Sequence, residues 1–132
     1  MKGYSIDLEK ETLKNKNFRR VLYTAKHSQL VLMSLEPGEE IGAEVHPRLD
    51  QFFRFEKGKG KVIIDKAKYE VKDGSCAIVP AGAKHNVINT SKKEDLKLYT
   101  IYSPPEHIDK VVRKTKAEAL AKPEEYDGRT TE

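Results

Sequence analysis

The sequence predicts one all-β domain, either a sandwich or a barrel. Short apolar segments recur along most of the chain, and each is bounded by Gly, Pro, Asp or Asn. This is the pattern of short strands joined by tight turns. The chain has 132 residues, a length that supports one hydrophobic core but not two.

The elements follow in order. Residues 1–17 are polar and Lys-rich, and we expect an N-terminal arm with about one helical turn near 8–13. The barrel is expected over 18–103, beginning with a hairpin of strands 19–24 and 29–35 around a polar turn. Residues 104–132 form a C-terminal segment, with a helix at 115–121, that packs on the barrel or on a partner subunit. The remaining strands are expected at 41–46, 51–56, 61–65, 68–71, 75–79, 85–89 and 96–102.

Two strands carry apolar residues on both faces. Residues two apart share a face of a strand, so Phe52 lies opposite Phe53 and Phe55, and Tyr99 and Ile101 lie opposite Leu98 in the last strand. An apolar outer face needs a cover. We therefore expect a homodimer, or a C-terminal segment folded over these strands.

Composition limits the partners and the compartment. Charged residues make up 35% of the chain and the net charge is +4, but acidic and basic residues are interspersed, which indicates a solvated surface. Without an Arg cluster or an aromatic ladder, nucleic-acid binding is not expected. No segment has the length of a signal peptide core or a membrane span, so we expect a cytoplasmic protein with no membrane partner.

Two further predictions concern side chains outside any motif. Cys76, the single cysteine, is flanked by Ala77, Ile78 and Val79, so we expect a small buried thiol. His27 and His107 are assigned to solvent-exposed turns.

Four polar residues form a candidate metal site. Glu44 and His46 are two residues apart in a predicted strand, so their side chains point to one face about 6.6 Å apart. Gln51 begins the next strand, and His85 comes from a distant part of the sequence that only a closed sheet brings near. Two imidazoles, a carboxylate and an amide oxygen suit Mn, Fe, Ni, Co or Zn. Without Gln51 the rest form a two-histidine, one-carboxylate triad of the non-haem iron type.

Each of these residues also has an ordinary structural interpretation. Glu44 and His46 would then form an ion pair at the rim, Gln51 would be a hydrogen-bonding residue at a strand edge, and His85 would bond to backbone in the core. A thiolate-rich structural zinc site is not indicated, because the set holds no cysteine. Phe53 and Phe55, on the strand face of Gln51, are candidates for the apolar wall of a pocket.

The spacing of these residues resembles the two motifs of the cupin superfamily. Gly38, Glu44, His46, Gln51 and Gly58 follow the frame of the first motif, with Glu44 where the family usually has histidine and Gln51 where it has glutamate. The second motif is matched at every fixed position, by Gly74, Pro80, Gly82, His85 and Asn89. The chain is similar to the small single-domain bacterial and archaeal cupins, a group often labelled mannose-6-phosphate isomerase-like.

The resemblance implies a double-stranded β-helix, or jelly-roll, barrel with a divalent metal ion in its mouth. Two kinds of function fit. The first is a metal-dependent enzyme on a small polar substrate, either a sugar isomerase or a non-haem dioxygenase. The second is a non-catalytic module that binds a carbohydrate or an anion, with a structural metal. The sequence identifies no general base for isomerisation.

Overall fold

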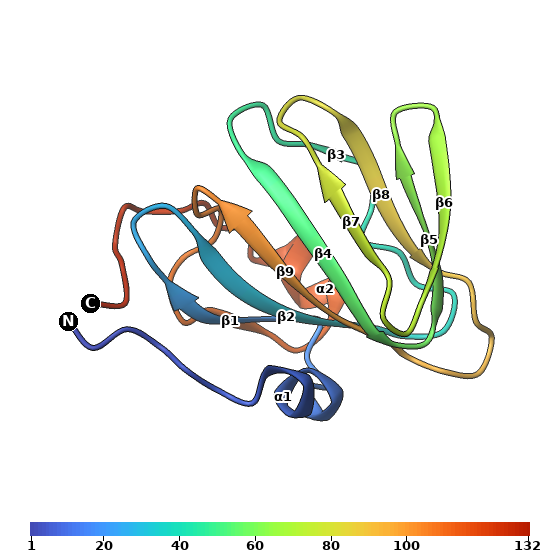
Figure 1. The fold of residues 1–132 in the computed structure, drawn as a ribbon, viewed down its shortest axis with the longest axis horizontal. Coiled ribbons are helices and arrows are strands. Elements are labelled where there is room, and N and C mark those ends of the chain that lie inside the picture. The colour runs from blue at the N-terminus through green and yellow to red at the C-terminus, as the bar shows by residue number, and fades with distance from the viewer.

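The computed structural model describes residues 1–132, and the chain folds into two antiparallel sheets with two short helices (Figure 1). A six-stranded sheet has the order β10-β1-β2-β9-β4-β7, and a four-stranded sheet has the order β3-β8-β5-β6. The elements in chain order are α1 (Leu8–Lys14), β1 (Arg19–Thr24), β2 (Gln29–Leu35), β3 (Glu44–Val45), β4 (Asp50–Lys57), β5 (Lys59–Ile64), β6 (Ala67–Lys72), β7 (Cys76–Val79), β8 (Lys84–Asn89), β9 (Leu96–Ser103), β10 (Val112–Arg113) and α2 (Lys116–Ala121).

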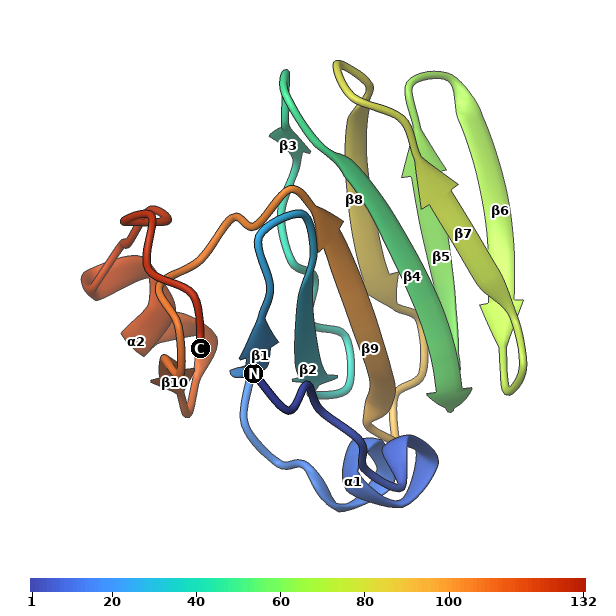
Figure 2. The same cartoon turned by 60° about the vertical axis from the view of Figure 1, so that its left-hand side comes forward.

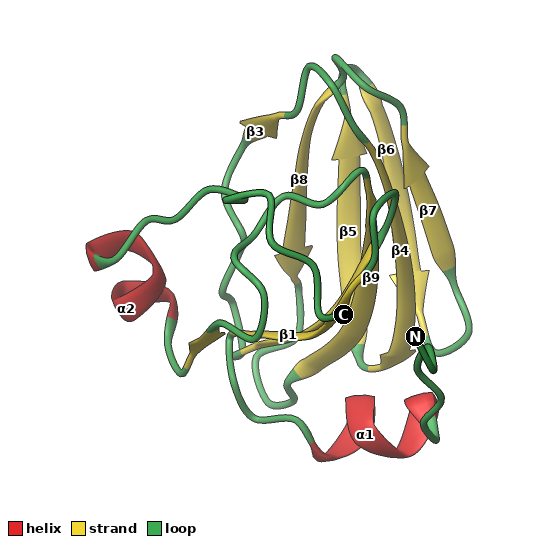
Figure 3. Ribbon diagram, turned by 90° about the vertical axis from the view of Figure 1, so that its left-hand side faces the viewer, coloured by secondary structure: helices red, strands yellow, loops and turns green.

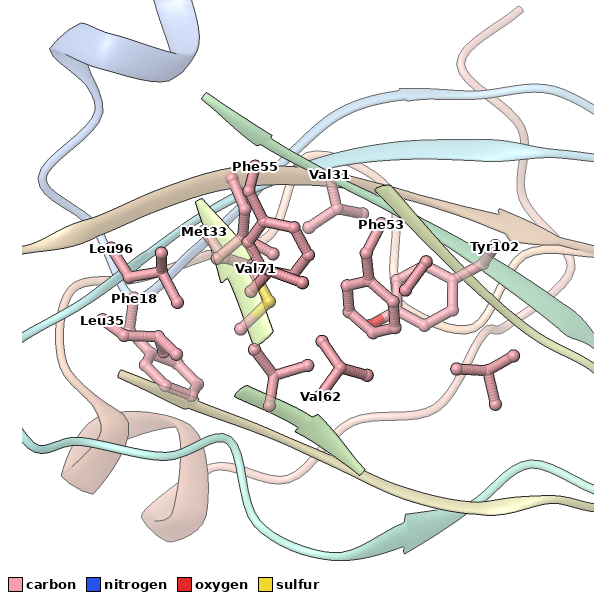
Figure 4. Packing of buried hydrophobic residues seen from close by; sticks show 14 of the residues in the cluster. Phe18, Val31, Met33, Leu35, Phe53, Phe55, Val62, Val71, Leu96 and Tyr102 are labelled. Carbon is pink, nitrogen blue, oxygen red and sulfur yellow. The ribbon is translucent and has the colours of Figure 1, made fainter. Parts of the chain in front are cut away.

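The strands form because their apolar residues alternate with polar ones at the period of a half-buried sheet. In β4, for example, buried and partly exposed residues alternate from Gln51 to Glu56. The inward side chains of both sheets meet in one apolar core, in which Phe53, Phe55 and Leu98 are fully buried. Figure 4 shows these two sets of side chains interdigitating between the sheets. The predicted all-β jelly-roll fold is therefore confirmed.

The two helices lie at different ends of the sandwich. Helix α1 packs against β9 and β4 at one end of the barrel (Figure 3), where the buried Lys97 donates hydrogen bonds to Asn15 O and to Ser34 Oγ. Helix α2 and β10 lie beyond the β1 edge, away from β6 and β7 (Figure 2). The chain termini are adjacent, since Lys2 N donates a hydrogen bond to Glu132 Oε1.

Several sequence expectations are corrected by the structure. The strand expected at 41–46 is reduced to Glu44–Val45, because Gly42 has a φ of +108° and interrupts the extended backbone. The strand expected at 61–65 begins two residues earlier, at Lys59, so that Gly60 lies within β5. A Cβ there would come within 2.7 Å of Ile88 O in the neighbouring strand β8 and within 2.8 Å of Leu96 Cδ2 in the other sheet, so this close packing requires glycine. The short strand β10 was not expected.

Cys76 is exposed, contrary to the prediction of a buried thiol. It lies in β7, where Ala77 and Val79 face the core while Cys76 and Ile78 face outward. The apolar flanks in the sequence do not reveal this alternation, because β7 is an edge strand with an exposed outer face. None of the helices has the length and apolar character to span a membrane.

Candidate metal centre

Glu44, His46 and His85 come together at the end of the barrel away from α1. β3 pairs antiparallel with β8 so that Glu44 lies directly opposite His85. His46 follows β3, and its backbone oxygen accepts a hydrogen bond from Gly82 N at 2.9 Å, which joins the two motif segments. One ligand atom from each of these three side chains lies within 4.8 Å of the others. Together the three residues form a cluster that can hold a metal ion.

The nitrogen atoms of the two histidines have distinct surroundings. His85 Nδ1 lies 3.1 Å from Ala83 O, so Nδ1 carries the proton and Nε2 presents its lone pair. His46 Nδ1 lies 3.8 Å from Glu106 Oε2, and its Nε2 lies 3.3 Å from Glu44 Oε2. Both Nε2 atoms are buried and make no hydrogen bond, and the contact of His46 Nε2 with Glu44 is that of an ion pair. The ring centroids of His46 and His85 are 5.3 Å apart.

Gln51 begins the inward face of β4 and is 2% exposed. Its cross-strand neighbours are Val79 and Tyr102, and the Tyr102 ring lies edge-on to the His46 ring at 6.0 Å. Gln51 Nε2 donates a hydrogen bond to Thr100 Oγ1 at 3.0 Å. Gln51 Oε1 is buried without a partner, so the amide presents an unused oxygen.

The charges in the cluster influence one another. Burial by itself would raise the pKa of Glu44, but the contact with His46 and the charge of Arg19 lower the pKa on balance. The Glu44 carboxylate raises the pKa of His46, against the opposing effect of burial. Burial raises the pKa of Glu106, and the nearby charge of His46 opposes this rise.

Phe53 and Phe55 lie behind the cluster. The Phe53 ring is 6.3 Å from the His85 ring and 6.3 Å from the Phe55 ring, in a stacked arrangement with the latter. Both side chains are fully buried. Neither lines the two cavities next to the cluster, and Phe55 lies farther from Tyr102 than Phe53 does (Figure 4).

These two cavities share Glu106, which sequence reasoning missed. The first has a volume of about 410 Å³ and is lined by His46, Arg48, Glu106 and Tyr126 among others. The second has a volume of about 230 Å³, and Glu44 and Glu106 are part of its wall. Glu106 follows Pro104 and Pro105 in a loop after β9, and no spacing pattern connects it to either motif. Only the fold brings it to the cluster.

A buried polar chain extends from the cluster to the C-terminal segment. His107 is 7% exposed, so its assignment to a solvent-exposed turn is wrong. Its ring lies between Tyr102 Oη, at 3.2 Å, and Glu124 Oε1, at 3.0 Å. Burial lowers the pKa of His107, partly offset by Glu124, and burial raises the pKa of Tyr102. His27 is exposed, as expected.

Comparison with known sequences identifies a family model and two similar proteins. Residues 31–102 match the family model described as the cupin domain. The chain is 47% identical over 126 residues to the uncharacterised protein YrkC of Bacillus subtilis, covering 91% of this chain and 67% of that one. It is 48% identical over 107 residues to an uncharacterised protein of Acanthamoeba polyphaga mimivirus, covering 79% of this chain and 67% of that one.

A solved structure has the same fold. The crystal structure of BH2720 from Bacillus halodurans superimposes with a TM-score of 0.89 at 44% identity, covering 92% of this chain and 96% of that one. The matched segment of the family model runs from β2 through β9 and includes both clustered histidines. This chain therefore belongs to the cupin superfamily.

Proposed function

We propose that the chain holds one divalent metal ion through Glu44, His46 Nε2, Gln51 Oε1 and His85 Nε2. Three of these four ligand atoms are buried polar atoms without a hydrogen-bond partner, and this is the observation that carries the proposal. Leaving a buried polar atom without a partner costs about 1–3 kcal/mol. A cation shared by all three atoms accounts for their lack of other partners.

The outer contacts of these side chains suit metal binding. A ligating histidine typically donates its second N–H to a carbonyl or a carboxylate, which fixes its tautomer and orientation. Ala83 O takes this role for His85, and Glu106 is the carboxylate nearest to His46 Nδ1. The Thr100 hydroxyl accepts a hydrogen bond from the amide nitrogen of Gln51 and so fixes the orientation of that amide. His85 Nε2 and Gln51 Oε1 are thereby held with their lone pairs free.

The donor set selects a class of metal. Two imidazoles, one carboxylate and one amide oxygen, with no thiolate, suit Mn, Fe, Ni, Co or Zn. Four protein ligands leave positions open in a six-coordinate shell. A substrate oxygen or water has room to bind there.

We further propose that the chain is an enzyme that acts on a small polar substrate, with chemistry of the sugar isomerase or non-haem dioxygenase type. When bound, the metal ion supplies a Lewis acid that polarises a substrate oxygen. Glu44, His46, Gln51 and His85 hold and orient that ion. Glu106 lines both adjacent cavities and accepts a hydrogen bond from a substrate hydroxyl. The modest volume of these cavities favours a small substrate.

Elemental analysis tests the metal proposal. Protein purified without added metal, and protein reconstituted in turn with each of the five metals, are compared with His46→Ala, His85→Ala and Gln51→Leu variants. The control is His27→Ala, which alters an exposed turn. We expect one metal ion per chain in the wild type and the control, and loss of metal in the ligand variants. Unchanged stoichiometry in all the ligand variants contradicts the site.

Activity assays then separate the functional alternatives. The Fe(II) form is tested for substrate-dependent oxygen consumption, and the Mn and Zn forms are tested for aldose–ketose conversion by NMR. Metal binding with neither activity supports the alternative, a non-catalytic module that binds a carbohydrate or an anion with a structural metal.

A further inference from the structure

The smaller cavity beside the metal cluster lies between the barrel mouth and α2. It has a volume of about 230 Å³, and its wall joins Glu44 of the cluster to residues of β1 and of the C-terminal segment. The basic residues in this wall are Arg19 and Lys116. In Figure 2, α2 lies beyond β1, and residues of both elements line the cavity. One ligand within this cavity can therefore contact both the metal cluster and a basic side chain.

Arg19 is buried with most of its donors unused. It is 9% exposed, and its guanidinium lies 5.5 Å from the centroid of the Phe18 ring. Its side chain makes a single hydrogen bond, a long one of 3.5 Å from Nη1 to Glu124 Oε1, while Nε is buried without a partner. A guanidinium has five N–H donors, and buried donors normally have acceptors. Arg19 Nε thus lacks an acceptor, and the residue lines the cavity.

The charges around the cavity leave room for an anion. Glu124 is shared between Arg19 and Arg113, with Arg113 Nη2 3.4 Å from Glu124 Oε2, so one carboxylate faces two guanidinium groups. Lys116 adds a positive charge to the wall, and Glu44, Glu106 and Glu124 add negative ones. Glu124 pairs with the two arginines, and a divalent ion bound at Glu44 offsets the other two carboxylates. With that ion in place, the wall carries a small excess of positive charge.

We propose that Arg19 anchors the carboxylate of a small organic acid whose second oxygen reaches the metal ion. This inference rests on the proposed metal function, and it selects an α-keto or α-hydroxy acid over a neutral sugar or a diketone. Arginine suits this role because its planar fork of N–H donors matches the two oxygens of a carboxylate. The small cavity favours such an acid over a sugar phosphate.

Binding of two matched probes to the Co(II)-loaded protein tests the anchor. Pyruvate and 2,3-butanedione have nearly the same shape, but only pyruvate carries a carboxylate. Binding is measured by calorimetry and by the visible spectrum of Co(II). The variants are Arg19→Gln and Arg19→Lys, and the matched control is Arg20→Gln, the next residue along β1, which faces away from the core.

We expect pyruvate to bind the wild type and Arg20→Gln alike, and to bind Arg19→Gln about ten- to a hundredfold more weakly. Arg19→Lys keeps the charge but not the fork, so its affinity is intermediate. Butanedione affinity is the same in every protein. If Arg19→Gln does not fold, as judged by circular dichroism, Arg19→Lys and Lys116→Gln decide the question, and both are expected to weaken pyruvate binding only.

The outcomes separate the anchor from the metal function. Unchanged pyruvate affinity in Arg19→Gln at full Co(II) occupancy overturns the anchor and leaves the metal site intact. If the wild type binds no metal, the metal function fails, and Arg19-dependent pyruvate binding without metal still supports the anchor. Arg19-dependent binding of dihydroxyacetone phosphate in place of pyruvate overturns the carboxylate assignment.

Discussion

Gln51 Nε2 donates a hydrogen bond to Thr100 Oγ1 across the β4–β9 pair, over 3.0 Å. This bond determines which end of the amide remains free, and the free end is the buried oxygen Oε1. An amide is a useful metal ligand only through its oxygen. The Thr100 hydroxyl therefore orients the proposed ligand, although Thr100 belongs to neither sequence motif.

The first prediction concerns this hydroxyl. Thr100→Val removes the acceptor of the Gln51 amide and keeps the side-chain shape, so the amide loses its fixed orientation. Loss of such an outer contact typically lowers metal affinity about 10–100-fold, and we expect a loss of that size. Competition with a chromogenic chelator measures the affinity. Thr100→Ser, which keeps a hydroxyl, is the control, and equal affinity in Thr100→Val and the wild type contradicts the orienting role.

A second prediction concerns the charge of the proposed ligand at position 51. Gln51→Glu replaces a neutral oxygen donor with a carboxylate at a position where related motifs carry glutamate. We expect tighter metal binding than in the wild type, whereas Gln51→Leu binds more weakly because it has no donor. The same chelator competition ranks the three proteins. An unchanged affinity across the series indicates that position 51 does not ligate.

A third prediction concerns Asn89, the last fixed residue of the second motif. Its side chain is 1% exposed, and Nδ2 lies within hydrogen-bond distance of Leu35 O, Glu36 O and Glu94 O. Asn89→Ala leaves these three carbonyls, of which Leu35 O is buried, without their donor. We expect the free energy of unfolding to fall by about 2–3 kcal/mol.

Urea unfolding followed by circular dichroism measures this loss. Lys92→Ala, in the exposed part of the loop that follows β8, is the matched control and is expected to leave stability unchanged. If the wild type, Asn89→Ala and Lys92→Ala have similar free energies of unfolding, the Asn89 side chain does not stabilise the loop that follows β8.

A fourth prediction concerns the pH dependence of stability through His107. Burial lowers the pKa of His107 in the folded state. As the pH falls through about 6.5, the unfolded chain therefore binds a proton at this residue more readily than the folded chain does. Protonation then favours the unfolded state, so the His107 contribution to stability falls with falling pH and returns as pH rises.

The measurement is the free energy of unfolding between pH 5 and pH 7.5, for the wild type and for His107→Gln. His46 titrates in the same range with its pKa shifted in the opposite direction, so the comparison uses the difference between the two proteins. The wild type should gain stability relative to His107→Gln as pH rises. A pH-independent difference contradicts a buried neutral His107.

A structural feature of this chain can be predicted from the sequence when neighbouring residues determine it. The hairpin strands Arg19–Thr24 and Gln29–Leu35 match the predicted ranges because their Val and Leu residues, and the polar turn between them, are local signals. Glu44, His46 and His85 meet as predicted because the motif spacing encodes a closed sheet. By contrast, Glu106 and Arg19 reach the site only through tertiary packing. The burial of His107 likewise depends on Glu124, seventeen residues further along the chain.

The last prediction concerns self-association through the outer face of the six-stranded sheet. Leu30, Ile101, Phe52 and Ile78 lie side by side across β2, β9, β4 and β7, and Ile78 is 64% exposed. This apolar row has the character of a surface that a second subunit covers, so we expect a homodimer by light scattering coupled to size exclusion. Ile78→Lys places a charge in the row and should yield a monomer. Tyr69→Lys, at an exposed position of the other sheet, should remain dimeric, and a wild type that is monomeric at working concentration contradicts the prediction.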